Sequence, residues 1–155
     1  MRLRLIGTAV LFAALALPAG DPPGVLMWKA AELKAFTKSL SPKIDALKVD
    51  TQQLGGHANY SFLMAHREGT GQAEWHDTQA DVMVIESGQG TLVVGGEMVD
   101  GKTTAPNEKR GSWISGGVEK KVGPGDIVTV PVKTAHQMKV DPGKEITYFV
   151  VKITP

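Results

Sequence analysis

The chain from Tyr60 onward is dominated by short β-prone runs, and no other feature constrains its fold as strongly. The runs are residues 60–65, 81–86, 91–94, 127–130, 136–140 and 146–153. Turn-forming residues separate them, for example at Gly123-Pro124-Gly125 and at Asp141-Pro142-Gly143. No segment that resembles a crossover helix lies between the runs, which argues against a parallel α/β sheet. The pattern predicts an all-β fold, either a double-sheet jelly roll or a related antiparallel barrel.

A short amphipathic helix is predicted ahead of these runs, over residues 28–40. Leu33, Phe36 and Leu40 recur at helical spacing, with charged residues between them, and Pro42 ends the segment. An apolar stripe of this period usually marks a packing face. We therefore expect the helix to pack on one end of the barrel or on a partner subunit.

Residues 97–122 are longer than an ordinary hairpin connection. They contain several turn signals, among them Asp100-Gly101, Pro106-Asn107 and Gly116-Gly117. Long loops in compact domains are often lids or binding loops. Two interpretations stay open for this segment: a functional loop, and a solvated loop that carries a small hairpin.

The segment before this long connection carries polar residues at regular spacing. It runs Glu74-Trp75-His76, four intervening residues, Asp81, six more residues, and then Gly88. Residues two apart in a strand face the same side, so Glu74 and His76 share one face and Trp75 takes the other. The four intervening residues allow a turn that returns Asp81 on a neighbouring strand at the same height.

The segment after the connection carries a second set of spaced residues. Gly125 is followed after five residues by Pro131, and His136 follows after a further gap. The rigid Pro131 precedes His136, which lies on a strand distant in sequence from the first segment.

These two segments resemble the motifs of the cupin superfamily, H-x-H-x4-E-x6-G and G-x5-P-x-G-x2-H-x3-N. Glu74 stands where the first motif has its first His, and Asp81 stands for its Glu. In the second motif Lys133 replaces the usual Gly and Val140 the usual Asn. Every spacing is kept. The resemblance covers about residues 60–153 and implies a cupin-type antiparallel β-barrel, a double-stranded jelly roll, with a short N-terminal helix.

The resemblance also implies one divalent metal ion at the barrel centre. Two imidazoles and two carboxylates that converge in an apolar barrel are costly to bury unless a cation compensates them. This set of ligands favours Mn²⁺ or Fe²⁺, and Zn²⁺ and Ni²⁺ also fit. Four protein ligands leave one or two positions open for water, substrate or O2. The predicted ligands are Glu74, His76, Asp81 and His136.

The alternative is a degenerate cupin that has lost its metal, with Glu74 in a salt bridge. His57 and His66 lie at no recognised offset, and we interpret them as surface or strand residues, although either could supply the absent imidazole. Arg67, Glu68 and Lys133 could orient an anionic substrate. We interpret them as ordinary solvated charges.

The resemblance does not determine one activity, because the family includes dioxygenases, isomerases, lyases, epimerases and non-catalytic proteins. The first interpretation is an enzyme that acts on a small organic or sugar-derived acid through the metal, with its catalytic residues unassigned. The second is a non-catalytic ligand-binding or metal-sequestering module. Family members commonly pair through barrel faces, so the resemblance implies a homodimer.

The first 19 residues are typical of a secretory signal peptide. A basic start at Arg2 and Arg4 precedes an uncharged apolar run over residues 5–19 that ends in small residues. This run is shorter than the roughly 20 residues that span a bilayer as a helix. We expect export to the periplasm or the extracellular space, and a membrane anchor is the alternative. The predicted organisation is a signal peptide (1–19), a linker with the helix (20–59) and the barrel (60–155).

Charge and cysteine content limit the partners. Cleavage near residue 19 removes two of the 17 basic residues, which leaves 15 against 16 acidic residues, a net charge of −1. Such a balance provides no electrostatic reason to bind nucleic acid or an anionic membrane. The chain has no cysteine, so disulfides are excluded and stability must come from an apolar core.

Overall fold

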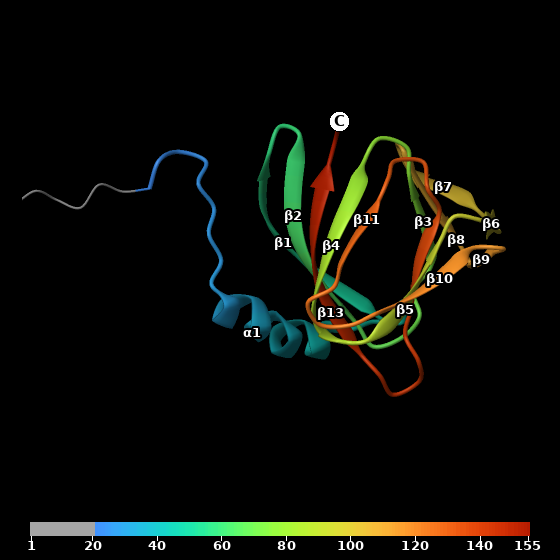
Figure 1. Cartoon of the computed structure of the whole chain (residues 1–155), viewed down its shortest axis with the longest axis horizontal. Helices are drawn as coiled ribbons and strands as arrows, with labels where there is room; N and C mark the ends of the chain where they lie inside the picture. Colours follow the sequence, from blue (N-terminus) through green and yellow to red (C-terminus); the bar gives the residue numbers. More distant parts are fainter. Residues whose placement is uncertain (1–20) are drawn as a thin grey trace, which may run out of the picture.

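The computed structural model describes residues 21–155, and the predicted signal peptide lies outside them. Two antiparallel β-sheets face each other to form a flattened barrel, and one helix lies outside it (Figure 1). The five-stranded sheet has the order β1-β2-β13-β4-β11. Its strands are β1 (Val49–His57), β2 (Tyr60–Arg67), β13 (Ile146–Ile153), β4 (Ala80–Gly88) and β11 (Ile127–Val130).

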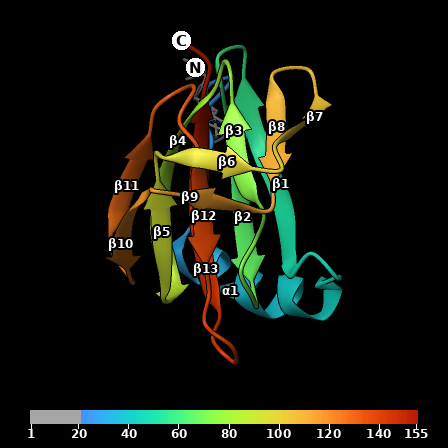
Figure 2. The same ribbon diagram turned by 90° about the vertical axis from the view of Figure 1, so that its right-hand side faces the viewer.

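The second sheet has six strands in the order β10-β5-β12-β3-β8-β7, and a two-stranded ribbon of β6 and β9 crosses its outer side (Figure 2). The strands of the sheet are β10 (Val118–Val122), β5 (Gly90–Val94), β12 (His136–Lys139), β3 (Ala73–His76), β8 (Glu108–Gly111) and β7 (Lys102–Ala105). The ribbon consists of β6 (Glu97–Val99) and β9 (Trp113–Ser115). All these pairings are antiparallel. The predicted all-β jelly roll is confirmed.

The main apolar core lies between the two sheets, because strand alternation sends one face of each inward. Met83 and Ile85 of β4 pack there against Leu92 of β5 and Met138 of β12. A smaller cluster on the outer side of the six-stranded sheet includes Trp75. Trp75 therefore faces away from its neighbours Glu74 and His76, as alternation requires.

Helix α1 (Ala30–Leu40) packs on the outer face of the five-stranded sheet, at one end of the barrel. It begins two residues after the predicted start, because Trp28 remains extended and its ring packs on Phe62 and Phe149, with ring centroids 5.1 and 5.7 Å away. Leu40 is fully buried, and a 3₁₀ turn that contains Pro42 follows it. Among residues 21–155, no helix is long and apolar enough to cross a membrane.

Two parts of the barrel differ from the sequence-based expectation. The barrel begins at Val49, because β1 pairs with β2 along an edge of the five-stranded sheet. Residues 97–122 form the five strands β6 to β10 instead of a long loop. Both segments are rich in polar residues and glycine, so their sequences lack the apolar alternation by which strands are recognised. Three of these strands, β1, β7 and β10, lie at sheet edges, where little of that alternation is required because one side has no neighbouring strand.

Backbone geometry explains three turn positions in the two motifs. Gly88 has a φ of +74°, and a Cβ atom there would collide with the carbonyl oxygen of Glu145. Gly125 has a φ of +89° with open space around it. Lys133 also adopts a left-handed φ, +56°, at the position where the second motif usually has glycine. The backbone of this turn is thus kept although the residue type is not, and the Lys133 N–H donates to the His76 carbonyl at 2.8 Å.

Candidate metal centre

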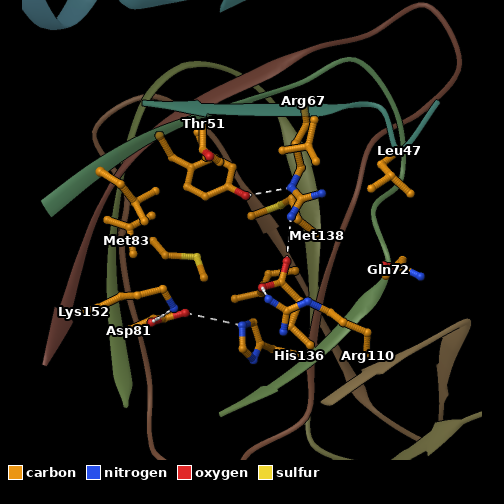
Figure 3. Close-up of a pocket in the computed structure, with 17 residues that line it drawn as sticks. Leu47, Thr51, Arg67, Gln72, Asp81, Met83, Arg110, His136, Met138 and Lys152 are labelled. Atoms are coloured by element: carbon orange, nitrogen blue, oxygen red, sulfur yellow. Dashed lines mark hydrogen bonds and ion pairs between the residues drawn. The ribbon is translucent and has the colours of Figure 1, made fainter. Parts of the chain in front are cut away.

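The structure places the four predicted ligands near one another inside one end of the barrel, and Asp81 and His136 are labelled in Figure 3. Glu74 and His76 come from β3, Asp81 from β4 and His136 from β12. His136 is paired with Glu74 across neighbouring strands. His76, Asp81 and His136 are 2, 3 and 3% exposed, whereas the Glu74 side chain is 21% exposed, so three of the four side chains are buried.

The distances between these groups resemble those around a bound ion. Asp81 Oδ2 lies 3.3 Å from His76 Nε2 and 3.5 Å from His136 Nε2. Atoms that bind one ion at about 2.0–2.2 Å lie roughly 3.0–3.6 Å apart in tetrahedral or octahedral geometry. Glu74 Oε2 is slightly farther from His76 Nε2, at 3.8 Å. Glu74, His76 and His136 nevertheless offer ligand atoms within 4.8 Å of one another.

Both histidines have their outer ring nitrogen held by an acceptor. His76 Nδ1 lies 2.7 Å from each carboxylate oxygen of Glu108, and His136 Nδ1 lies 3.1 Å from the Thr134 carbonyl oxygen. A carbonyl or carboxylate oxygen only accepts, so Nδ1–H must donate in both rings and each neutral ring presents its Nε2 lone pair to the site. Metal-binding histidines are commonly oriented in this way. His136 Nε2 is buried without a hydrogen-bond partner, which fits a site for a cation.

Lys152 of β13 supplies the positive charge nearest to Asp81. Its Nζ donates to Asp81 Oδ1 at 2.8 Å and lies 3.1 Å from His76 Nε2. Burial raises the pKa of the Asp81 carboxyl, but its interactions with the nearby His136 and His76 rings and with the charge of Lys152 outweigh burial and hold that pKa well below its usual range. Asp81 is therefore ionised at neutral pH.

His76 has the opposite shift. Burial lowers its pKa and the charge of Lys152 lowers it further, but the nearby carboxylates of Asp81 and Glu108 raise it above its ordinary value. The His76 ring thus lies between two carboxylates that stabilise its charged form.

Glu74 is held by two arginines. Arg67 Nη2 donates to Glu74 Oε1 at 2.7 Å, and Arg110 Nη2 lies 3.5 Å from Oε2. Burial raises the pKa of Glu74, while the two guanidinium groups lower it to a value below the ordinary one. Arg67 also donates from Nε to the Tyr148 hydroxyl at 2.7 Å. Arg67 is only 6% exposed, so its interpretation as a solvated charge is wrong.

The acidic and basic side chains of the site are equal in number. Three carboxylates are matched by three cationic side chains, and the two sets are Glu74, Asp81 and Glu108, and Arg67, Arg110 and Lys152. From the sequence, we expected that a bound metal ion would have to compensate the buried carboxylates. The chain supplies this compensation itself, so burial of the carboxylates does not by itself require a metal ion.

Several of these site residues were not predicted from the sequence. Glu108 and Arg110 lie on β8, opposite His76 and Glu74 in the antiparallel register, within the segment interpreted as a loop. The inward direction of Lys152 could have been predicted from strand alternation. Lys152 follows Tyr148 and Val150 at alternate positions of β13, and those two residues face the interior.

The other two histidines do not reach the site. His57 is exposed and its Nε2 lies 2.8 Å from the Gly24 carbonyl oxygen. His66 is fully buried on the outer face of the five-stranded sheet, where Nδ1 lies 2.8 Å from Thr147 Oγ1. Thr147 in turn contacts Thr37 of α1 at 2.9 Å. Neither histidine supplies the missing imidazole, and His66 instead belongs to the contact between sheet and helix.

A cavity of about 310 Å³ adjoins the site. Apolar side chains from both sheets form much of its wall, and the charged side chains of Arg67, Asp81, Arg110 and Lys152 also line it (Figure 3). The apolar lining includes Leu63, Met83, Leu92, Met138 and Val150. A volume of this size is at the lower end of that of small-molecule sites.

The sequence matches no family model and no curated protein, but solved structures share its fold. A cupin 2 conserved barrel domain protein from Rhodopseudomonas palustris has 20% identity and a TM-score of 0.50 over 69% of this chain and 61% of its own. A putative mannose-6-phosphate isomerase from Ralstonia eutropha JMP134 has 15% identity and a TM-score of 0.51, covering 72% and 90%. A recombinant oxalate oxidase in complex with glycolate has 12% identity and a TM-score of 0.50, covering 71% and 53%.

The chain therefore has the fold of the cupin superfamily, which confirms the resemblance drawn from the two motifs. It spans about three fifths of the Rhodopseudomonas palustris protein and about half of the oxalate oxidase. Likeness at these identities establishes the fold alone. The role of the four polar residues as metal ligands stays a prediction.

Proposed function

We propose that this chain is a small metal-binding cupin that acts on a small organic or sugar-derived acid. One observation carries the metal part of the proposal. Two buried imidazoles, His76 and His136, direct Nε2 towards the same Asp81 oxygen while acceptors hold each Nδ1. The residues that would hold the ion are Glu74, His76, Asp81 and His136.

A divalent ion bound there would supply Lewis acidity at its open positions, and two imidazoles with two carboxylates favour Mn²⁺ or Fe²⁺, with Zn²⁺ and Ni²⁺ also suitable. The side chains of the site already balance in charge, so a divalent ion adds two uncompensated positive charges. An anionic acid would offset one or both of these charges next to the buried ligands. Arg67 and Arg110 line the cavity, and guanidinium groups bind carboxylates well. These features support an acid as the ligand.

A second candidate is a non-catalytic cupin that binds a ligand or sequesters a metal without catalysing a reaction. The observation that favours it is the ion pairing of both proposed carboxylate ligands with side chains of the same chain. A site that is compensated in this way can exist without metal. The two candidates differ in metal content and in turnover.

The decisive experiment begins with metal analysis of protein purified from its native host, followed by reconstitution with Mn²⁺, Fe²⁺, Zn²⁺ and Ni²⁺. We expect about one equivalent of metal, a higher melting temperature on loading, and loss of both effects in His136→Ala. The matched control is His57→Ala, which changes an exposed histidine on β1. Less than about a tenth of an equivalent in the wild type would favour the metal-free candidate. A screen of small organic acids, with and without O2, then tests turnover.

We also propose that the protein is exported to the periplasm or the extracellular space. The basic start and the apolar run of residues 5–19 support this proposal. N-terminal sequencing of protein from the native host should find residues 1 to about 19 missing. An intact Met1 in a cytosolic fraction would contradict it.

A homodimer is the proposed assembly. The family resemblance supports it, and so do the exposed apolar side chains Val118 and Ile127 on the edge strands β10 and β11, which are 61 and 67% exposed. Analytical ultracentrifugation at micromolar concentration tests the proposal, and a single monomeric species would reject it.

A further inference from the structure

Lys152 brings a positive charge into the proposed metal centre. Its side chain starts from β13 and reaches Asp81 (Figure 3). The ammonium group donates to Asp81 Oδ1 at 2.8 Å and is 3.1 Å from His76 Nε2. Neutral His76 can only accept through Nε2, because its Nδ1–H donates to Glu108. Lys152 therefore uses lone pairs of two predicted metal ligands.

The remaining ligands differ in how they are satisfied. Glu74 is bound by Arg67 and Arg110. Within residues 21–155, His136 Nε2 is the buried side-chain nitrogen that has no hydrogen-bond partner. The cations of the chain thus contact three of the four ligands, and His136 Nε2 receives no hydrogen bond from any of them.

We infer that Lys152 is a built-in competitor of the metal ion, an inference that rests on the proposed function. Its ammonium group compensates Asp81 and His76 while the centre is metal-free, and it leaves them when a metal ion binds. Both cations are attracted to His76 Nε2 and to the Asp81 carboxylate, and they repel each other at short distance. Departure is feasible because lysine has a flexible four-carbon stem and Lys152 is 20% exposed at the cavity wall.

The inference predicts that removal of this charge strengthens metal binding. Isothermal titration calorimetry with Zn²⁺ and with Mn²⁺ compares the wild type with Lys152→Met and Lys152→Arg. We expect Lys152→Met to bind at least about tenfold more tightly, and the charge-retaining Lys152→Arg to stay within about threefold of the wild type. Lys139→Met is the matched control, because Lys139 pairs with Glu119 in an exposed position on β12, and we expect it to bind as the wild type does.

Thermal unfolding gives a second readout. Metal-free Lys152→Met should melt at a lower temperature than the wild type, because Asp81 is left buried without its cation. Metal should then raise its melting temperature by more than it raises that of the wild type. If Lys152→Met does not fold, Lys152→Gln replaces it, since its amide still donates a hydrogen bond and carries no charge.

The outcomes separate this inference from the proposed function. Equal metal affinity in the wild type and in Lys152→Met overturns the inference and leaves the metal-binding function standing. Equal tightening in Lys139→Met also overturns it, because the effect would then reflect net charge alone. Absence of metal binding in every variant overturns both.

Discussion

Glu108 is predicted to control metal affinity without binding the metal. Both of its carboxylate oxygens lie 2.7 Å from His76 Nδ1, so Glu108 orients the ring and increases the basicity of Nε2. Removal of such a partner typically weakens metal binding 10–100-fold, which is about 1.4–2.8 kcal/mol. In Glu108→Gln the amide oxygen still accepts the hydrogen bond but the charge is lost, so we expect a loss of about tenfold. In Glu108→Ala both are lost, and we expect a loss nearer to about 100-fold.

Competition with a chromophoric chelator measures these affinities for Zn²⁺ and Mn²⁺, and circular dichroism establishes that each variant is folded. Glu119→Gln is the control, because Glu119 of β10 forms only an exposed ion pair, with Lys139 of β12. The reasoning is refuted if Glu108→Ala binds metal as tightly as the wild type. It is also refuted if Glu119→Gln weakens binding to the same extent, because the effect would then be long-range electrostatics.

Three further predictions concern stability, and urea unfolding measures each of them. Gly88→Ala should lower the unfolding free energy by at least about 2 kcal/mol, and Gly125→Ala should lower it by only about 1 kcal/mol. Both glycines have a positive φ, but only at Gly88 do backbone atoms lie against the position of an added Cβ. Equal losses in the two variants would reject the steric argument. Lys133→Gly should raise the unfolding free energy by up to about 1 kcal/mol by relieving a left-handed φ, and a clear decrease would show that the turn is unstrained. Thr37→Val should lower it by about 1 kcal/mol through loss of the 2.9 Å contact with Thr147; unchanged stability would mean that this contact does not hold α1.

The spacing of the two motifs could be read from the sequence because it reflects local geometry. Glu74 and His76 share a strand face, and the turn before Asp81 has a length that the chain specifies directly. Strands with strong apolar content, such as β11 and β13, were predicted with the bounds that the structure has. By contrast β1 and the strands of residues 97–122 were missed, because their mixed polarity gives no apolar alternation and pairing with other strands stabilises them.

The sequence by itself determined the all-β class, the cupin motif spacing and the four side chains that share the interior. The tertiary structure alone decided their electrostatic state. Arg67, Glu108 and Lys152 come from three strands of two sheets, and the register between strands brings them against the motif residues. Charge compensation acts through space over a few ångströms in a buried site. No sequence pattern predicts this charge compensation, whereas alternation within one strand is a property of residues that are close in sequence.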